Sequence, residues 1–156
     1  MSDERPPFRG SSDSLPRALA AELSKLDPWS FWSVPLVGDR VAVIGTTGAF
    51  LVALNEDEGY LEVRGRRGDV GGKRIGGLRG LRREAKMLRD RISSFAVYTP
   101  VEPVVCLSRG VAGGPRPLGG VTVVPLGDLA RHVAGREKVL HRDRARRAAE
   151  RLAGPP

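Results

Sequence analysis

Acidic side chains stand at both ends of one apolar segment, residues 41–54, and are the groups in this chain best suited to chemistry. Asp39 precedes the segment, and three further acidic residues follow it: Glu56, Asp57 and Glu58. Carboxylates of this kind hold Mg²⁺ or Mn²⁺ for phosphodiester hydrolysis. The alternative interpretation is structural, with Asp39 in a turn and residues 56–58 in a solvated acidic loop.

The single cysteine, Cys106, and the two histidines, His132 and His141, are further reactive side chains. Their spacing matches no zinc motif. Cys106 lies in an apolar run, residues 103–107, and we expect it to be a small core residue. No serine has a nucleophile-elbow context, and residues 45–48 lack the ending of a phosphate-binding loop. We therefore expect no cofactor, and Mg²⁺ or Mn²⁺ only if the carboxylates above are catalytic.

Charge is unevenly distributed along the sequence, whose formal net charge is +8. Residues 1–63 hold 5 basic and 10 acidic side chains, whereas residues 64–91 hold 11 basic and 3 acidic ones. Residues 131–156 are again basic, with 8 basic and 3 acidic side chains. Arginine beside glycine-rich backbone suits phosphate, because the guanidinium group makes bidentate contacts. The distribution favours a nucleic-acid partner, and DNA in particular.

Six basic residues are the candidate nucleic-acid contacts: Lys73, Arg74, Arg79, Arg82, Arg83 and Lys86. The first two belong to a glycine-rich loop, and the other four lie on the polar side of an expected helix over 78–93. Binding through them would depend little on base sequence and would weaken steeply with salt. A solvated basic surface is an alternative, in which Glu84 pairs with Arg83 or Arg89 and Asp90 with Lys86. A contact with a protein or an anionic membrane surface is a further alternative.

Hydrophobic periodicity predicts alternating helices and strands. We expect helices over 14–26, 78–93, 126–134 and 136–153, the first capped by Asp13 or Ser14. We expect strands over 29–36, 60–64, 101–107 and 121–125, and a hairpin over 41–54. The glycine-rich stretches 65–77 and 109–120 are predicted to be loops. Trp29 and Trp32 fall in the first expected strand, where we expect both to be core residues; the alternative is that one is exposed as a stacking or partner-binding platform.

The hairpin and the elements around it resemble the nuclease-related domain (NERD) family, a branch of the restriction-endonuclease-like fold. In the hairpin the resemblance rests on Ile44-Gly45, Gly48 and Phe50. It extends over about residues 14–135 through the ordered set of helices and strands. In the family the hairpin carries a metal-binding aspartate, a second carboxylate and a lysine, and these positions fall on Arg40, Ala53 and Asn55. A glutamate on the family's first helix would fall nearer Pro16 than Glu22.

The resemblance implies an α/β fold with a restriction-endonuclease-like mixed central sheet flanked by helices. An Arg-rich C-terminal helix follows outside the resemblance. It also implies a lost metal site, because Arg40 brings positive charge, Ala53 offers no oxygen and Asn55 lacks the lysine charge. We therefore expect a catalytically inactive domain that binds nucleic acid. A divergent Mg²⁺- or Mn²⁺-dependent nuclease using Asp39 and residues 56–58 is one alternative, and a protein-interaction scaffold using the C-terminal helix is another.

The expected organisation is one domain with short extensions. Residues 1–13 are predicted to be a disordered lead-in, 14–135 the nuclease-related domain, and 136–156 a basic helix and tail. No run approaches the ~18 apolar residues of a membrane span, and the N-terminal residues lack a signal-peptide pattern. A lone cysteine suits a reducing compartment. These features together predict a cytoplasmic protein without a membrane span.

Overall fold

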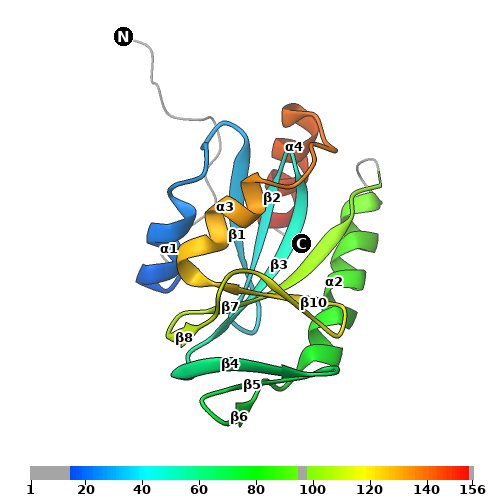
Figure 1. Ribbon diagram of the computed structural model, residues 1–156. Helices are drawn as coiled ribbons and strands as arrows, with labels where there is room; N and C mark the ends of the chain where they lie inside the picture. The colour runs from blue at the N-terminus through cyan, green and yellow to red at the C-terminus, as the bar shows by residue number, and fades with distance from the viewer. Residues whose placement is uncertain (1–14, 95–97, 155–156) are drawn as a thin grey trace.

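A central sheet lies between two layers of helices, and a smaller sheet closes one end of the molecule (Figure 1). The computed structural model describes residues 15–94 and 98–154. The predicted lead-in, residues 1–13, lies outside the described residues. Asp13 and Ser14, the caps proposed for the first helix, lie outside them too. The predicted α/β class, with a mixed central sheet flanked by helices, is confirmed.

The central sheet contains six strands. In spatial order they are β1 (Phe31–Leu36), β2 (Arg40–Gly45), β3 (Gly48–Asn55), β7 (Val101–Leu107), β10 (Val121–Pro125) and β9 (Arg116–Leu118). β7 runs parallel to both β3 and β10, and the other neighbouring pairs are antiparallel. The predicted hairpin is confirmed: Gly45 pairs with Gly48, so the turn consists of Thr46 and Thr47. Gly48 has a φ of 112°, a conformation that a side chain would strain.

The smaller sheet combines the strand predicted over residues 60–64, which is confirmed, with short strands inside the stretches predicted to be loops, so the loop prediction is wrong in part. Its strands, in spatial order, are β6 (Lys73–Arg74), β5 (Arg67–Val70), β4 (Gly59–Arg64) and β8 (Gly110–Val111). Gly71 and Gly72, with φ values of 58° and 82°, reverse the chain between β5 and β6. β8 pairs with β4 through only two residues, Gly110 and Val111, which come from a distant part of the chain.

Two helices cover each face of the central sheet. On one face lie α1 (Arg17–Leu23) and α3 (Leu129–Ala134), the latter preceded by the short helix η1 (Leu126–Asp128). On the other face lie α2 (Leu78–Ser93) and α4 (Arg142–Ala153). The prediction for α2 is confirmed. No helix in the described part of the chain is long and apolar enough to cross a membrane.

The predicted start of the last helix, near Arg136, is wrong. α4 begins at Arg142 because the His141 imidazole accepts a hydrogen bond from the Asp143 amide at 3.2 Å and occupies the N-cap position. The residues before it form a linker that binds the hairpin tip. Here the Thr46 carbonyl accepts hydrogen bonds from the amides of Val139, at 2.8 Å, and Leu140, at 3.0 Å.

Side chains pack into two cores, one on each face of the central sheet. The α2 side is filled by the helix residues Leu81, Ala85, Leu88 and Ile92 together with α4. α4 contributes Ala145, Ala148, Ala149 and Leu152, all buried, so the basic C-terminal helix is part of the main core. Small side chains at this helical spacing allow α4 to approach β1 and β2 closely.

Candidate functional site

The two metal-ligand positions implied by the resemblance lie directly opposite each other in the hairpin. Arg40 on β2 pairs with Ala53 on β3. The Arg40 Nε atom lies 3.0 Å from Glu84 Oε2, on helix α2. Both side chains are partly exposed, at 28% for Arg40 and 47% for Glu84. A guanidinium–carboxylate pair therefore stands where a divalent cation would need oxygen ligands.

Glu84 is the one residue of this arrangement that the sequence did not point to. The periodicity of α2 placed Glu84 beside Arg83 and Arg89, but the structure pairs it with Arg40. Asp90 likewise pairs with Arg89, at 3.2 Å, rather than with Lys86. Arg40 and Glu84 are 44 residues apart, so local helical spacing carries no signal for their contact.

Asp39 lies in the turn between β1 and β2, and its φ of 60° is in the left-handed region. It lines an open groove of about 860 Å³ together with Arg40, Asn55 and Glu56. The first helix contributes Pro16 and Leu19 to the same groove. The groove therefore gathers Arg40, at one of the two implied ligand positions, Asn55, at the implied lysine position, and two of the four acidic candidates.

The remaining acidic candidates face a second depression of about 370 Å³, where Glu56 also appears. Each of them has a basic neighbour: Asp57 lies 4.0 Å from Lys73, and Glu58 lies 3.0 Å from Arg109. The Asp57 amide also donates to the Asn55 side-chain oxygen at 3.0 Å, which orders the start of the acidic loop. Asp57 and Glu58 thus pair with cations away from Asp39, whereas Glu56 shares the groove with Asp39 and makes no ion pair among the described residues.

A metal fits these residues poorly. Arg40 brings a fixed positive charge, Ala53 brings no donor atom, and the carboxylates of Asp57 and Glu58 are paired with lysine and arginine. Among residues 15–94 and 98–154, no group of three acidic, histidine or cysteine side chains is arranged to hold a metal ion. The positions implied by the resemblance therefore offer a divalent cation few oxygen ligands of their own.

Glu22, the acidic residue on α1, has a structural role. Its side chain is 5% exposed, and Oε2 accepts a hydrogen bond from the Ala130 amide at 3.0 Å. Oε1 is paired with Lys25 at 2.7 Å. Glu22 thus ties α1 to the beginning of α3, on the face of the sheet opposite Glu84.

The six candidate nucleic-acid contacts lie on β6 and along α2, and all are exposed. We call them the basic face: Lys73, Arg74, Arg79, Arg82, Arg83 and Lys86. The four on α2 follow the i, i+3, i+4, i+7 spacing that gathers side chains on one side of a helix. They span about 10 Å along the helix axis, at ~1.5 Å per residue.

Two members of the basic face already have partners within the protein. Arg82 donates a hydrogen bond to the Gly119 carbonyl, which connects α2 to the turn between β9 and β10. Lys73 is the partner of Asp57 described above. In the described part of the chain, Arg74, Arg79, Arg83 and Lys86 make no ion pair within 4.0 Å. Those four are available for an anionic ligand.

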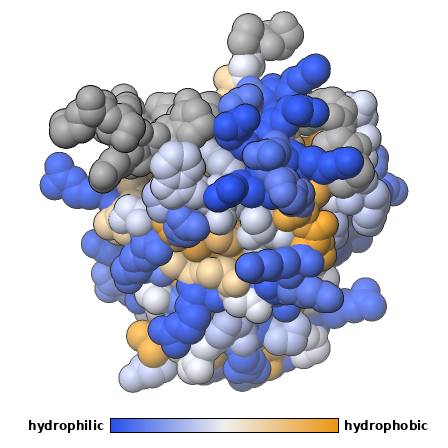
Figure 2. Space-filling view, turned by 90° about the horizontal axis from the view of Figure 1, so that it is seen from above, coloured by the Kyte–Doolittle hydropathy of each residue, from blue (hydrophilic) through white to orange (hydrophobic). Residues whose placement is uncertain are grey.

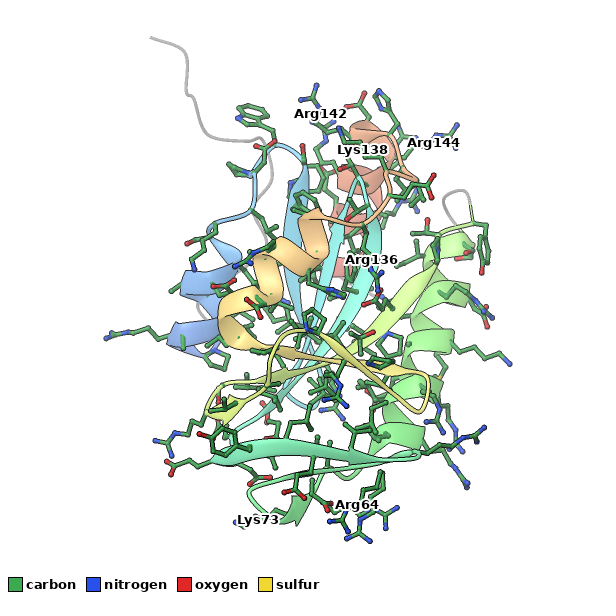
Figure 3. All side chains as sticks on the ribbon, viewed as in Figure 1. Arg64, Lys73, Arg136, Lys138, Arg142 and Arg144 are labelled. Carbon is green, nitrogen blue, oxygen red and sulfur yellow. The ribbon has the colours of Figure 1, made fainter. Side chains whose placement is uncertain are left out.

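Further basic side chains lie near the basic face, and a second group lies at the opposite end of the molecule. Arg64 and Lys73 lie on the smaller sheet at the bottom of Figure 3, whereas Lys138, Arg142 and Arg144 lie at the top. Figure 2 looks down on the top end and shows hydrophilic residues around small hydrophobic areas. The protein therefore presents two separate basic regions.

A partly buried ion cluster connects β7, α3 and the linker to α4. His132 Nε2 lies 2.5 Å from Glu102 Oε2, and Arg136 lies 2.5 Å from Glu102 Oε1. Burial acts to raise the pKa of Glu102, but His132, by its hydrogen bond and charge, and Arg136 outweigh burial and lower it. The His132 ring also meets Phe50 edge-on, with centroids 6.4 Å apart. Packing of His132 on the core indicates that the cluster anchors α3.

Cys106 is fully buried, as its apolar surroundings in the sequence predicted. Burial raises its pKa to about 12, and the Glu22 carboxylate adds to the effect. The thiolate that a nucleophile requires is therefore disfavoured.

Comparison of the chain with models of known protein families, with curated proteins and with solved structures finds no match.

Proposed function

We propose that this protein is a nuclease-related, restriction-endonuclease-like domain without a working metal site, which binds nucleic acid through the basic face. DNA is the favoured partner. The observation that carries the proposal is the set of four exposed cations, Arg74, Arg79, Arg83 and Lys86, that make no ion pair among the described residues. The ion pair between Arg40 and Glu84 is a second support, because Arg40 stands at one of the two positions at which the family would bind its cation.

The chemistry of the basic face predicts the mode of binding. Guanidinium groups at helical spacing contact phosphate oxygens and carry no base-edge specificity by themselves. Each phosphate that a cation neutralises adds about 0.9 to the slope of log affinity against log salt. Binding should therefore be weakly sequence-selective and should weaken steeply as salt is raised.

The test is titration of a labelled DNA duplex at several salt concentrations, followed by fluorescence anisotropy. The test variant carries Arg79→Glu, Arg83→Glu and Lys86→Glu. The matched control carries Arg17→Glu, Arg131→Glu and Arg147→Glu, with the same change in net charge but on other helices. We expect the test variant to lose at least tenfold in affinity and about three units of salt slope, at about 0.9 per contact. Equal losses in both variants, or in neither, would overturn the proposal.

Parallel reactions with Mg²⁺, Mn²⁺ or a chelator test the loss of the metal site. We expect the duplex to be bound to the same extent in all three and to stay intact. Metal-dependent cleavage that disappears in the Asp39→Ala variant would contradict the proposal and establish the divergent nuclease.

A further inference from the structure

A pocket at the end of the molecule opposite the basic face combines aromatic and basic side chains. It is an open depression of about 430 Å³ lined by Trp29, Trp32, Arg142, Asp143 and Arg146. We call it the tryptophan pocket. Trp29 is 41% exposed and Trp32 only 4%, so Trp32 belongs to the core while Trp29 offers part of its indole to a ligand. The Arg142 label in Figure 3 marks this end of the molecule.

Trp29 is outside the strand in which the sequence placed it. β1 begins at Phe31, and Trp29 lies in the turn before it. Asp27 orders this turn, since its side chain accepts hydrogen bonds from the Trp29 amide, at 3.1 Å, and from the Ser30 hydroxyl, at 2.8 Å. The backbone that carries the exposed indole is therefore fixed.

The hairpin tip holds both walls of the tryptophan pocket. The Thr46 amide donates to the Ser30 carbonyl at 3.2 Å, which secures the turn that carries Trp29. The Thr46 carbonyl accepts from Val139 and Leu140, which secures the linker directly before α4 and its arginines. Walls from distant parts of the chain thus meet at one residue, and the pocket is formed before a ligand arrives.

The charges at the tryptophan pocket favour an anion. Arg142 makes no ion pair within 4.0 Å in the described part of the chain. Arg146 is 39% exposed, and its Nε atom lies 3.5 Å from the Glu150 carboxylate, so this arginine is partly neutralised within α4. Asp143 is the acidic residue of the lining, and its carboxylate lies 3.8 Å from the His141 ring. Lys138 and Arg144 add positive charge at the same end (Figure 3).

We propose that the tryptophan pocket binds an unpaired nucleotide, with the base stacked on Trp29 and the phosphate on Arg142 and Arg146. This inference rests on the proposed function and adds a single-strand contact to it. Indole faces stack on any base, and arginine forks suit phosphate oxygens. The volume lies within the ~300–1,000 Å³ range of small-ligand pockets. A strand bound there and a duplex on the basic face would occupy opposite ends of the protein.

The test is anisotropy titration of labelled hexathymidylate, an oligonucleotide too short to make many backbone contacts. We expect Trp29→Ala to weaken binding by at least about fivefold, the lower end of what one stacked base contributes. Trp29→Phe, which keeps an aromatic face, should restore most of the affinity. Tyr60→Ala is the matched control, because Tyr60 is 74% exposed and lies on β4. Circular dichroism spectra of all variants check that they fold.

The outcomes separate this inference from the proposed function. The triple variant of the basic face should lose duplex binding and keep hexathymidylate binding. Equal affinity of wild type and Trp29→Ala for hexathymidylate would overturn the tryptophan pocket alone. Absence of hexathymidylate binding, with Trp29-dependent binding of a polyglutamate peptide instead, would overturn it in favour of an acidic protein partner.

Discussion

The Arg40 guanidinium and the Glu84 carboxylate lie 3.0 Å apart, between the start of β2 and the middle of α2. This contact joins the hairpin to the helix that carries most of the basic face. It also withdraws Glu84 from its neighbours on α2, which leaves Arg83 without an acidic partner among the described residues. One ion pair thus connects the hairpin position implied by the resemblance with the exposed side of α2.

The stability that this pair contributes should be small. Both side chains are partly exposed, and water screens such pairs, so Arg40→Ala is expected to lower the free energy of unfolding by at most about 1 kcal/mol. Urea denaturation of Arg40→Ala, Glu84→Ala and the double variant isolates the coupling between the two side chains. A coupling energy of several kcal/mol would show that the pair is a principal stabilising contact instead.

The hydrogen bond from Ala130 to Glu22 should matter more. The carboxylate is buried, so Glu22→Ala leaves the Ala130 amide without its acceptor and should cost about 1–3 kcal/mol in the free energy of unfolding. Lys25→Ala removes only the exposed partner of the same carboxylate and is the control, with an expected loss below about 1 kcal/mol. Similar losses in the two variants, measured by urea denaturation, would argue against the capping role of Glu22.

The cluster around Glu102 predicts a dependence of stability on pH. Because folding lowers the pKa of Glu102 from its ordinary value of 4.5, the ionised carboxylate stabilises the fold above that pH. This contribution is lost as the pH falls through the folded-state pKa. Glu102→Gln should therefore destabilise the protein at neutral pH by about 1–3 kcal/mol, and the difference from wild type should shrink in acid.

The measurement is urea denaturation of wild type and Glu102→Gln over a series of pH values from neutral into acid. Glu137→Gln is the matched control, because Glu137 is exposed and has no ion pair among the described residues. A difference between wild type and Glu102→Gln that stays constant over the whole series would mean that the charge of Glu102 contributes nothing.

Cys106 should report on unfolding. With the thiol buried and its pKa raised to about 12, we expect a disulfide reagent to leave the native protein unmodified at neutral pH and to label it fully in denaturant. The labelling rate in native conditions should then follow the rate or extent of opening. Rapid labelling without denaturant would show that the thiol is accessible and would contradict its place in the core.

Long, strongly periodic elements could be predicted from the sequence. α2 is indicated by the spacing of Leu81, Ala85, Leu88 and Ile92, and the hairpin by two apolar runs around a glycine-bounded turn. The short strands could not be predicted in the same way. β5, β6, β8 and β9 exist because they pair with other strands, and glycine-rich stretches carry no side-chain pattern that indicates such pairing.

The contacts of the candidate site could not be predicted from the sequence either, because they join residues that are far apart along the chain. The charge on the polar side of α2 was readable from helical spacing, which indicated Arg79, Arg82, Arg83 and Lys86. Lys73 and Arg74 were indicated by their position in the glycine-rich stretch before that helix. The sequence could not show that Arg82 contacts Gly119, because that contact joins residues 37 positions apart. Nor could it show that Trp29 and Arg142 line one pocket, since only the folded hairpin tip brings them together.

The position of α4 has a consequence for synthesis of the protein on the ribosome. This helix is the last element of the described chain, yet it covers the faces of β1 and β2, which are among the first to be made. Until α4 has emerged, the apolar side chains of those strands, including Trp32 and Ile44, have no helix above them. The nascent chain would thus carry an exposed apolar surface until α4 has been made, a state prone to aggregation. The core on this face of the sheet can therefore be completed only after α4 has been made.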